Sequence, residues 1–298
     1  MKIMHDVDMR EYTSFRAGGC ADTMAVPEST EELQQLLQDL RRSGREYLLL
    51  GNGSNTIFRD EGYHGTVIHL GDAFSSIKVD GERLICGSAA LISAAAHEAM
   101  EHGLSGMEPI SGIPGSIGGA VFMNAGAYGG EMKQVIESVQ VVSADGQEIR
   151  TLSNEELQLG YRMSRIQKTG ELVVSVTMKL TPADRADILS AMQEFMQKRN
   201  SKQPLQYPSA GSFFKRPEGY FAGKLIQDAG LKGASVGGAQ ISAKHSGFMI
   251  NRGGATADDI LKLMHLVQNT VKNRFGVDME PEVRIVGGPA EKNEKEGR

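Results

Sequence analysis

A glycine-rich turn at residues 51–55 is the first segment whose residue types suggest chemistry. Its sequence Gly-Asn-Gly-Ser-Asn directly follows the apolar run at 47–50. Glycines allow positive φ and bring backbone N–H groups close to an anion, so the segment predicts a phosphate-binding turn. It does not fit the dinucleotide fingerprint, because Thr56 stands where that pattern has its third glycine. An ordinary turn after a strand remains the alternative.

A second candidate is the stretch 111–130, where glycine and alanine are concentrated. The whole chain holds 36 glycines among 298 residues, about 12% against a usual ~7%. Side chains this small cannot fill a core, yet Ile113, Val121 and Phe122 interleave with the glycines, which is not typical of a flexible linker. The pattern favours a rigid loop pressed against a flat ligand over a linker.

Two further segments carry polar groups beside apolar ones. Ser212 stands between small residues and two phenylalanines within 208–217, so its hydroxyl would lie at the edge of an apolar pocket. A plain surface serine is equally consistent with that pattern, and no Ser-His-Asp arrangement can be read from the chain. Two glutamates flank a proline at 280–282 beside Arg284, a pattern that on its own is typical of a solvated strand end.

Strands alternate with helices through the first two thirds of the chain and must position these segments. Leucines at helical spacing after Ser29 predict a helix that ends at Gly44, and an Asp-Gly pair at 145–146 predicts a hairpin. Two prolines follow the helical stretch 184–198 and interrupt regular structure, which places a domain boundary near residue 198. Beyond it, one apolar face over 256–276 predicts a long helix.

The composition, 40% hydrophobic and 23% charged over 298 residues, is that of a globular protein. No apolar run has the length of a membrane span and no secretory signal is visible, so we expect a cytoplasmic protein without membrane contact. A net charge of -5 without a basic block argues against nucleic-acid binding. The 2 cysteines and 7 histidines show no metal-ligand spacing, and no metal is expected.

Taken in order, the motifs resemble those of the UDP-N-acetylenolpyruvoylglucosamine reductase family, flavoenzymes that make UDP-N-acetylmuramate for bacterial peptidoglycan. The resemblance covers residues 10–288 and rests on GNGSN at 51–55, SGIPGSIGGAVFMNAGAYGG at 111–130, GYRMS at 160–164, PSAGSFFKRP at 208–217, AGKLIQDAGL at 222–231, GGAQIS at 237–242 and EPEVRIVG at 280–287. Each motif is weak alone, whereas all of them in family order are very specific.

The resemblance implies an α+β fold with two domains. Residues 1–198 would be a two-part FAD-binding module of the vanillyl-alcohol oxidase / p-cresol methylhydroxylase type, split near residue 71. Residues 199–288 would be a smaller α+β substrate-binding domain, and 289–298 a disordered tail.

The same resemblance implies roles for individual residues. The catalytic residues would be Arg162, Ser212 and Glu282. Non-covalently bound FAD would be held by Gly51, Asn52, Gly53, Ser54, Asn55, Gly112, Pro114, Gly115, Ser116, Gly118, Gly119, Asn124, Ala125 and Gly126. The substrate would be bound by Tyr161, Arg199, Lys202, Arg216, Gln240 and Arg284.

This chain departs from some members of the family at two places. Those members have asparagine where this chain has Arg216, so a neutral contact with the substrate would become a charge-assisted one. The interval between Arg162 and Arg199 is too short for the tyrosine-bearing loop of the other subclass. The chain therefore resembles the subclass that lacks that loop.

The implied reaction reduces the enolpyruvyl group of UDP-N-acetyl-3-O-(1-carboxyvinyl)-glucosamine to give UDP-N-acetylmuramate. NADPH would reduce the flavin, and hydride would pass from FADH2 to the terminal vinyl carbon. Arg162 and Glu282 would stabilise the charge that builds up beside the carboxylate, and Ser212 would donate the proton. We expect a monomer that acts on a small UDP-sugar.

Two other classes of protein stay open. A flavin-dependent oxidase of a small alcohol could share the FAD module, although the second half of the chain gives no match for it. A non-catalytic binding module would be colourless, so a visible spectrum would separate it from a flavoenzyme.

Overall fold

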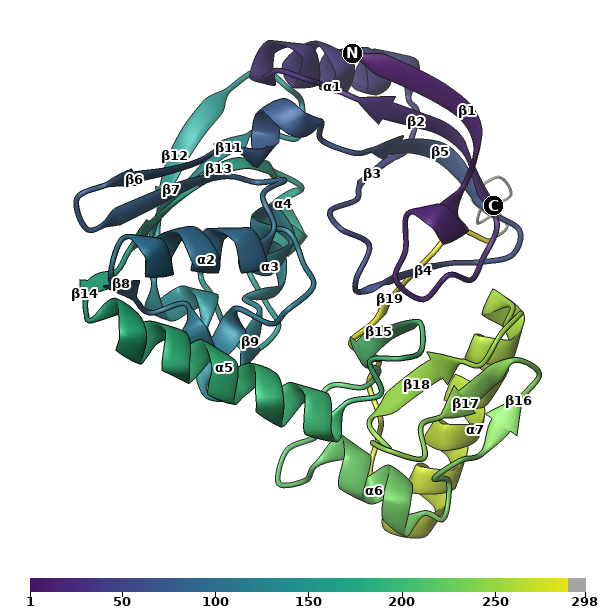
Figure 1. Cartoon of the computed structure of the whole chain (residues 1–298). Helices are drawn as coiled ribbons and strands as arrows, with labels where there is room; N and C mark the ends of the chain where they lie inside the picture. The colour runs from purple at the N-terminus through teal and green to yellow at the C-terminus, as the bar shows by residue number, and fades with distance from the viewer. Residues whose placement is uncertain (289–298) are drawn as a thin grey trace. The chain divides into compact units, whose positions relative to one another are not determined.

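The computed structural model describes residues 1–288 and divides into two compact units (Figure 1). The first unit comprises residues 1–3, 25–52 and 67–202, and the second comprises residues 4–24, 53–66 and the described chain from 203 onward. Each unit is therefore assembled from separate stretches of sequence. The domain division predicted at residues 71 and 198 stays a prediction, and the tail predicted to be disordered, 289–298, lies outside the described residues.

A five-stranded antiparallel sheet forms the centre of the first unit. Its strand order is β12 (Ile149–Ser153), β11 (Ile136–Val142), β13 (Leu172–Lys179), β7 (Arg83–Gly87) and β6 (Ile77–Asp80). Successive side chains of a strand point to opposite faces, and Val141 and Val142 accordingly belong to two different buried clusters. The hairpin predicted at 145–146 is confirmed by the pairing of β11 with β12.

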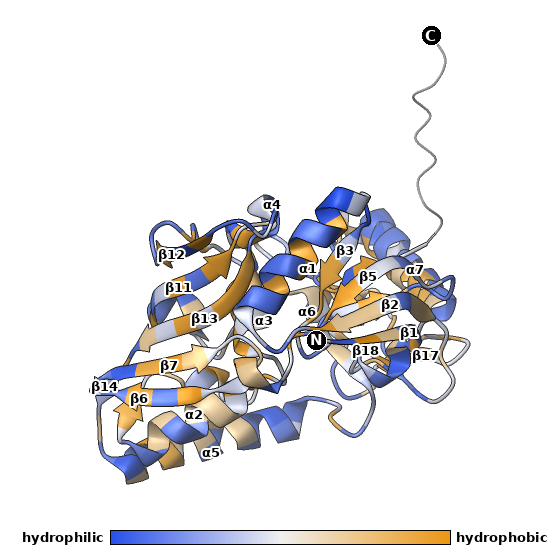
Figure 2. Cartoon of the chain, turned by 90° about the horizontal axis from the view of Figure 1, so that it is seen from above, coloured by the Kyte–Doolittle hydropathy of each residue, from blue (hydrophilic) through white to orange (hydrophobic). Residues whose placement is uncertain are grey.

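Helices cover both faces of this sheet. α1 (Thr30–Ser43) packs its leucines against Val142, Leu172 and Val174 on one face. On the other face lie α2 (Ile92–Glu101) and α3 (Ile117–Met123). The unit also contains α4 (Ile166–Thr169) and the long α5 (Arg185–Lys202). Figure 2 shows apolar residues concentrated in β11 and β13, and polar beside apolar residues in α1.

Local signals set the ends of α1. The Ser29 hydroxyl accepts a hydrogen bond from the Glu32 N–H at 3.2 Å, which satisfies one of the free donors of the first turn. Gly44 ends the helix in the left-handed conformation with φ 63°. The predicted beginning and end of this helix are both confirmed.

A further four-stranded sheet is formed by residues between 2 and 68. Its order is β1 (Lys2–Asp8), β2 (Cys20–Val26), β5 (Tyr63–Ile68) and β3 (Tyr47–Leu49). Two short pairs complete the strands outside the second unit, β9 (Gly126–Ala127) with β10 (Gly130–Glu131) and β8 (Leu104–Ser105) with β14 (Thr181–Pro182).

The second unit has its own small sheet, in the order β15 (Ser209–Ser212), β18 (Phe248–Asn251), β17 (Ala239–Ile241) and β16 (Ser235–Val236). α7 (Ala257–Phe275) packs against β16 and β17, and α6 (Ala222–Asp228) contacts α7 (Figure 1). Thr256 caps α7, Gly276 ends it, and its apolar face is buried. The long helix predicted here is confirmed.

Distant stretches of sequence are joined in the second unit. β19 (Arg284–Val286) pairs in parallel with β4 (Thr56–Phe58). The Asp60 carboxylate accepts hydrogen bonds from the N–H groups of Ala257 and Asp258, both at 2.8 Å, at the start of α7. Segments near the N-terminus are therefore integral parts of this unit.

Candidate functional site

The turn at 51–55 presents a row of backbone donors. Gly53 has φ +60°, and a Cβ at this position would lie 1.9 Å from the Tyr12 carbonyl oxygen, so only glycine fits. Within residues 1–288, the N–H groups of residues 52–55 donate to no protein acceptor. Consecutive free N–H groups suit the oxygens of a phosphate.

The same turn contacts the glycine-rich segment within the first unit. The Asn52 side-chain amide donates to the Pro114 carbonyl oxygen at 2.8 Å. A Cβ on Gly51 would lie 2.5 Å from Ser116 Oγ, and Ser116 Oγ accepts a hydrogen bond from the Gly119 N–H at 3.3 Å at the start of α3. The structure therefore brings together two segments that the sequence indicated separately as ligand-binding loops.

The segment 111–130 is not the single rigid loop that the sequence predicts. Its middle forms α3, whose apolar side chains are buried, and its end forms the β9–β10 hairpin. Tyr128 and Gly129 both have positive φ, 52° and 88°, the pattern of a type I′ turn. A Cβ atom added to Gly118 would lie 2.8 Å from the Ser88 Cβ, which is too close. Some glycines here thus serve close packing of backbone, which sequence alone does not distinguish from contact with a ligand.

Arg162 occupies a strained position in a tight turn. Gly160 and Met163 exchange backbone hydrogen bonds of 3.0 and 3.2 Å, so Tyr161 and Arg162 are the central residues of that turn. Arg162 has φ +53°, a conformation that costs a non-glycine residue roughly 1–3 kcal/mol. Its guanidinium donates to the Gly126 carbonyl oxygen at 3.2 Å and lies 5.1 Å from the Tyr161 ring centre. Arg162 is therefore brought to the end of the glycine-rich segment.

Asn124 is fully buried, and its side chain is used inside the protein. Its Nδ2 donates to the Glu131 carboxylate at 3.2 Å and to the Gly160 carbonyl oxygen at 2.9 Å. Its Oδ1 accepts from the Lys133 N–H at 2.9 Å. The cofactor contact predicted for Asn124 would then fall to its backbone, while the side chain ties the glycine-rich segment to the turn that carries Arg162.

The last turn of α5 carries two residues predicted to bind substrate. Arg199 lies against the glycine-rich segment, since a Cβ on Gly112 would be 3.2 Å from Arg199 Cδ. Desolvation lowers the pKa of the Arg199 guanidinium, and within residues 1–288 no carboxylate pairs with it. Arginine stays charged in proteins, so this position favours an anionic ligand group. Lys202 is exposed at the end of the same helix.

In the second unit, Ser212 and Glu282 lie on neighbouring backbone segments. The Glu282 N–H donates to the Phe213 carbonyl oxygen at 2.8 Å. Phe213 and Phe214 are buried and anchor the strand, whereas Ser212 is exposed. Among the described residues, the Ser212 hydroxyl has no hydrogen-bond partner. It does not serve as a cap for the backbone and is available to a ligand.

Asn55 joins the turn at 51–55 to Glu282. Its Nδ2 donates to the Glu282 carbonyl oxygen at 3.1 Å, and its own carbonyl oxygen accepts from the Arg284 N–H at 3.0 Å. The three residues form one hydrogen-bonded framework within the second unit.

Gln240 and Arg216 also belong to the second unit. Gln240 Nε2 donates to the Gly233 carbonyl oxygen at 3.1 Å, and its Oε1 accepts from Arg252 at 3.3 Å. The Arg216 guanidinium lies 3.8 Å from the centre of the Phe221 ring, a cation–π contact that orders a long side chain. Both side chains are thus held by contacts within the unit.

The predicted residues are distributed over both units. The second unit contains Gly53, Ser54, Asn55, Ser212, Arg216, Gln240, Glu282 and Arg284, and the first contains all the others. Within the first unit, Gly51 and Asn52 contact the glycine-rich segment, which Arg162 and Arg199 also contact. Within the second, Asn55, Ser212 and Glu282 are brought together.

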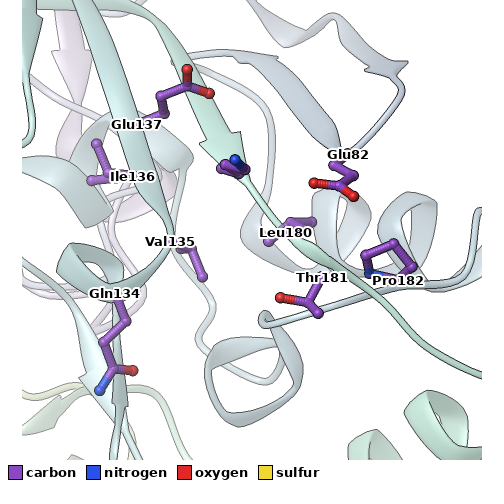
Figure 3. Close-up of a pocket in the computed structure, with 9 residues that line it drawn as sticks. Glu82, Gln134, Val135, Ile136, Glu137, Leu180, Thr181 and Pro182 are labelled. Atoms are coloured by element: carbon purple, nitrogen blue, oxygen red, sulfur yellow. The ribbon is translucent and has the colours of Figure 1, made fainter.

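A pocket of about 440 Å³ in the first unit is lined by none of these residues (Figure 3). Its lining is Glu82, Gln134, Val135, Ile136, Glu137, Lys179, Leu180, Thr181 and Pro182. Glu137 there pairs with Arg83 at 2.7 Å. Because no predicted site residue lines the pocket, it is not part of the candidate site. Residues 1–288 contain no group of three or more His, Cys, Asp or Glu placed to hold a metal.

The part of the chain that the structure describes has no helix with the length and apolar character needed to cross a membrane.

Comparison with known proteins decides the family. Residues 203–286 match the family model for the C-terminal domain of UDP-N-acetylenolpyruvoylglucosamine reductase. The UDP-N-acetylenolpyruvoylglucosamine reductase of Clostridium botulinum is 50% identical over 288 residues, covering 96% of this chain and 92% of that protein. This chain belongs to the UDP-N-acetylenolpyruvoylglucosamine reductase family. A relative of the same name from Geobacillus kaustophilus is 48% identical over 285 residues, covering 96% and 93%.

Family membership confirms the predicted fold class. Residues 21–152 match the family model of an FAD binding domain. The crystal structure of UDP-N-acetylenolpyruvylglucosamine reductase from Thermus caldophilus has a TM-score of 0.84 at 37% identity and covers 96% of this chain and 100% of that chain. The chain is an FAD-dependent oxidoreductase of mixed α+β fold, with an FAD-binding domain followed by the C-terminal domain of this reductase family.

The residues present fit FAD. The N–H groups at 52–55, which donate to no acceptor among the described residues, suit its pyrophosphate. Ser88 is 3% exposed, and within residues 1–288 its Oγ has no hydrogen-bond partner, although it lies against Gly118. A buried hydroxyl normally has a partner, and a ligand beside α3 would provide one. Ser88 belongs to none of the sequence motifs, and the only local signal for it is the run of small residues at 87–90, where a strand ends.

Proposed function

We propose that this chain is an NADPH-dependent reductase that converts UDP-N-acetyl-3-O-(1-carboxyvinyl)-glucosamine to UDP-N-acetylmuramate for peptidoglycan synthesis. The observation that carries the proposal is the Ser212 hydroxyl, which is exposed and has no protein partner among the described residues. The next residue, Phe213, accepts a hydrogen bond from the Glu282 N–H through its carbonyl oxygen. Relatives 50% and 48% identical carry the name of this reductase.

The proposed residues match the demands of the reaction. An enol ether has no activated double bond, so hydride addition to its terminal carbon builds up charge beside the carboxylate. Arg162, always charged, and Glu282, protonated or hydrogen-bonded to the substrate, would stabilise that charge. The Ser212 hydroxyl would donate its proton to the carbon that bears the carboxylate. A hydroxyl is a weak acid in water, but a forming carbanion in contact with it supplies a large driving force.

Bound FAD, once NADPH has reduced it, would supply the hydride. The N–H groups of residues 52–55 would hold its pyrophosphate, and the backbone of residues 112–126 would lie along its ring system. The guanidinium of Arg199, which pairs with no carboxylate in the described part of the chain, would face an anionic group of the substrate. The other residues proposed to bind the UDP-sugar are Tyr161, Lys202, Arg216, Gln240 and Arg284.

NADPH and the UDP-sugar would use one site in turn, because the sequence shows no second nucleotide-binding motif. A monomer would suffice, since all the proposed residues belong to one chain. Both compounds are metabolites of the cell interior, so we place the reaction in the cytoplasm.

An anaerobic titration tests the proposal. The purified protein should show bands near ~370 and ~450 nm from the oxidised flavin. NADPH should bleach these bands, and the enolpyruvyl substrate should restore them. A colourless protein would contradict the proposal, and bleaching by a small alcohol but not by NADPH would point to an oxidase.

The first prediction is that FAD is bound without a covalent link, because neither the 51–55 turn nor the 112–126 segment contains His or Cys. Precipitation with trichloroacetic acid should leave the yellow colour in the supernatant. Colour that stays with the pellet would show the prediction to be wrong.

The second prediction is that Gly119→Val lowers FAD occupancy. The added Cβ would lie 3.3 Å from Ser116 Oγ, and the branched side chain would occupy space where backbone and flavin approach. Gly119→Ala, which adds the Cβ alone, should lower FAD occupancy less than Gly119→Val does. The ratio of flavin to protein absorbance measures occupancy. Full occupancy in Gly119→Val and in Gly115→Val would mean that this segment does not contact the flavin.

A further inference from the structure

Gln167 holds the turn that carries Arg162. Its Nε2 donates to the Arg162 carbonyl oxygen at 3.1 Å and to the Phe122 carbonyl oxygen at 2.7 Å. The residue lies in α4 and is exposed, and none of the sequence motifs includes it. One side-chain amide therefore links this turn to the C-terminal half of α3.

The turn is anchored on its other side as well. The buried Asn124 donates to the Gly160 carbonyl oxygen at 2.9 Å, at the beginning of the turn. The Ser164 hydroxyl donates to the Phe122 carbonyl oxygen at 2.7 Å, directly after the turn. Gln167 supplies the bond to Arg162 itself.

A left-handed arginine needs such anchors. Arg162 has φ +53°, and a residue with a Cβ relaxes to negative φ unless its surroundings prevent it. A change of φ redirects the Cα–Cβ bond and would move the guanidinium away from the Gly126 carbonyl oxygen, which it now contacts at 3.2 Å. The hydrogen bond that fixes the Arg162 backbone therefore also aims its side chain.

We propose that Gln167 is a positioning residue for the reaction, and that its amide keeps Arg162 in the left-handed conformation that directs the guanidinium to the substrate. The inference rests on the proposed function, in which Arg162 stabilises charge on the substrate. Gln167 acts through Arg162.

The test uses the full chain loaded with FAD. Gln167→Met keeps the length of the side chain and removes its donor. Reoxidation of the reduced flavin by the enolpyruvyl substrate should slow about tenfold, since a small misplacement of a catalytic group is costly, while bleaching by NADPH should stay within about twofold of wild type. Gln167→Lys keeps a donor and should recover most of the rate. Lys168→Met, an exposed neighbour in α4, is the matched control and should behave as wild type.

A double-mutant cycle separates positioning from a general structural role. In an Arg162→Ala background, Gln167→Met should cause no further loss of the reoxidation rate, because the side chain through which it acts is gone. If Gln167→Met slows reoxidation by the same factor with and without Arg162→Ala, the inference is wrong. Equal slowing of both half-reactions in Gln167→Met would overturn it too.

A second readout does not depend on activity. An arginine-specific protease should cleave after Arg162 severalfold faster in Gln167→Met than in wild type or Lys168→Met, because the turn is released. Unchanged cleavage would overturn the inference. A wild-type protein that NADPH bleaches and the substrate does not reoxidise would overturn the proposed function, whereas an active wild type with an equally active Gln167→Met would overturn the role of Gln167 alone.

Discussion

Ser212→Ala loses most of its turnover, by about 10²-fold or more, while FAD binding and flavin reduction by NADPH stay intact. A methyl group cannot supply a proton, and loss of a general acid commonly costs 10²-fold to 10⁴-fold. The fold should tolerate the change, because the hydroxyl is exposed and has no partner in the described chain. Stopped-flow absorbance of the flavin, following bleaching by NADPH and reoxidation by substrate separately, measures both effects.

Ser212→Cys is the matched variant for this prediction. A thiol can donate a proton from nearly the same position, so part of the lost turnover should return. If Ser212→Ala instead turns over within about threefold of wild type, then water or another side chain donates the proton, and the assignment of Ser212 is wrong.

Glu282→Gln should leave bleaching by NADPH near the wild-type rate and slow reoxidation by the substrate by about 10²-fold. The charge that Glu282 would stabilise arises only when hydride reaches the enolpyruvyl group, so the earlier step does not depend on it. The backbone of Glu282 keeps its hydrogen bonds to Phe213 and Asn55 in this variant, which preserves the local framework.

Glu280→Gln provides the control for this experiment. Glu280 lies two residues away and pairs with Lys215 at 2.5 Å on the surface, and it has no proposed role. Both half-reactions should keep their wild-type rates in Glu280→Gln. Equal slowing of the two half-reactions in Glu282→Gln would point to a damaged fold or a shared binding role.

The parts of the fold with strong local signals could be predicted from the sequence. α1 and α7 have capping residues, glycine ends and a clear apolar face, and both are confirmed. β15 was not predicted, because its small residues Ser209–Ser212 have little tendency to form a strand. Its pairing with β18 produces the strand, with Ser212 opposite Phe248. Such pairing depends on contacts between distant residues, which local patterns do not contain.

The candidate site shows the same limit. Residue types identified the turn at 51–55, and the family resemblance singled out Ser212 and Glu282, but nothing in the sequence places Asn55 beside Glu282. That contact is a hydrogen bond of 3.1 Å between residues far apart in the chain, and it forms only when the chain folds. Gln167 could not be identified from the sequence, because an exposed glutamine on a short helix has no chemical signature of its own.

The parallel pairing of β19 with β4 has a consequence for how the protein is made. Ile285 lies opposite Ile57, so the second unit cannot be completed until residues 284–286 have left the ribosome. Contacts this distant in sequence are slow to form, because closure of a long loop precedes any gain from the contact. Until then the apolar partners of the last strand stay uncovered on the nascent chain. The second unit is therefore expected to fold only after its last strand has been synthesised.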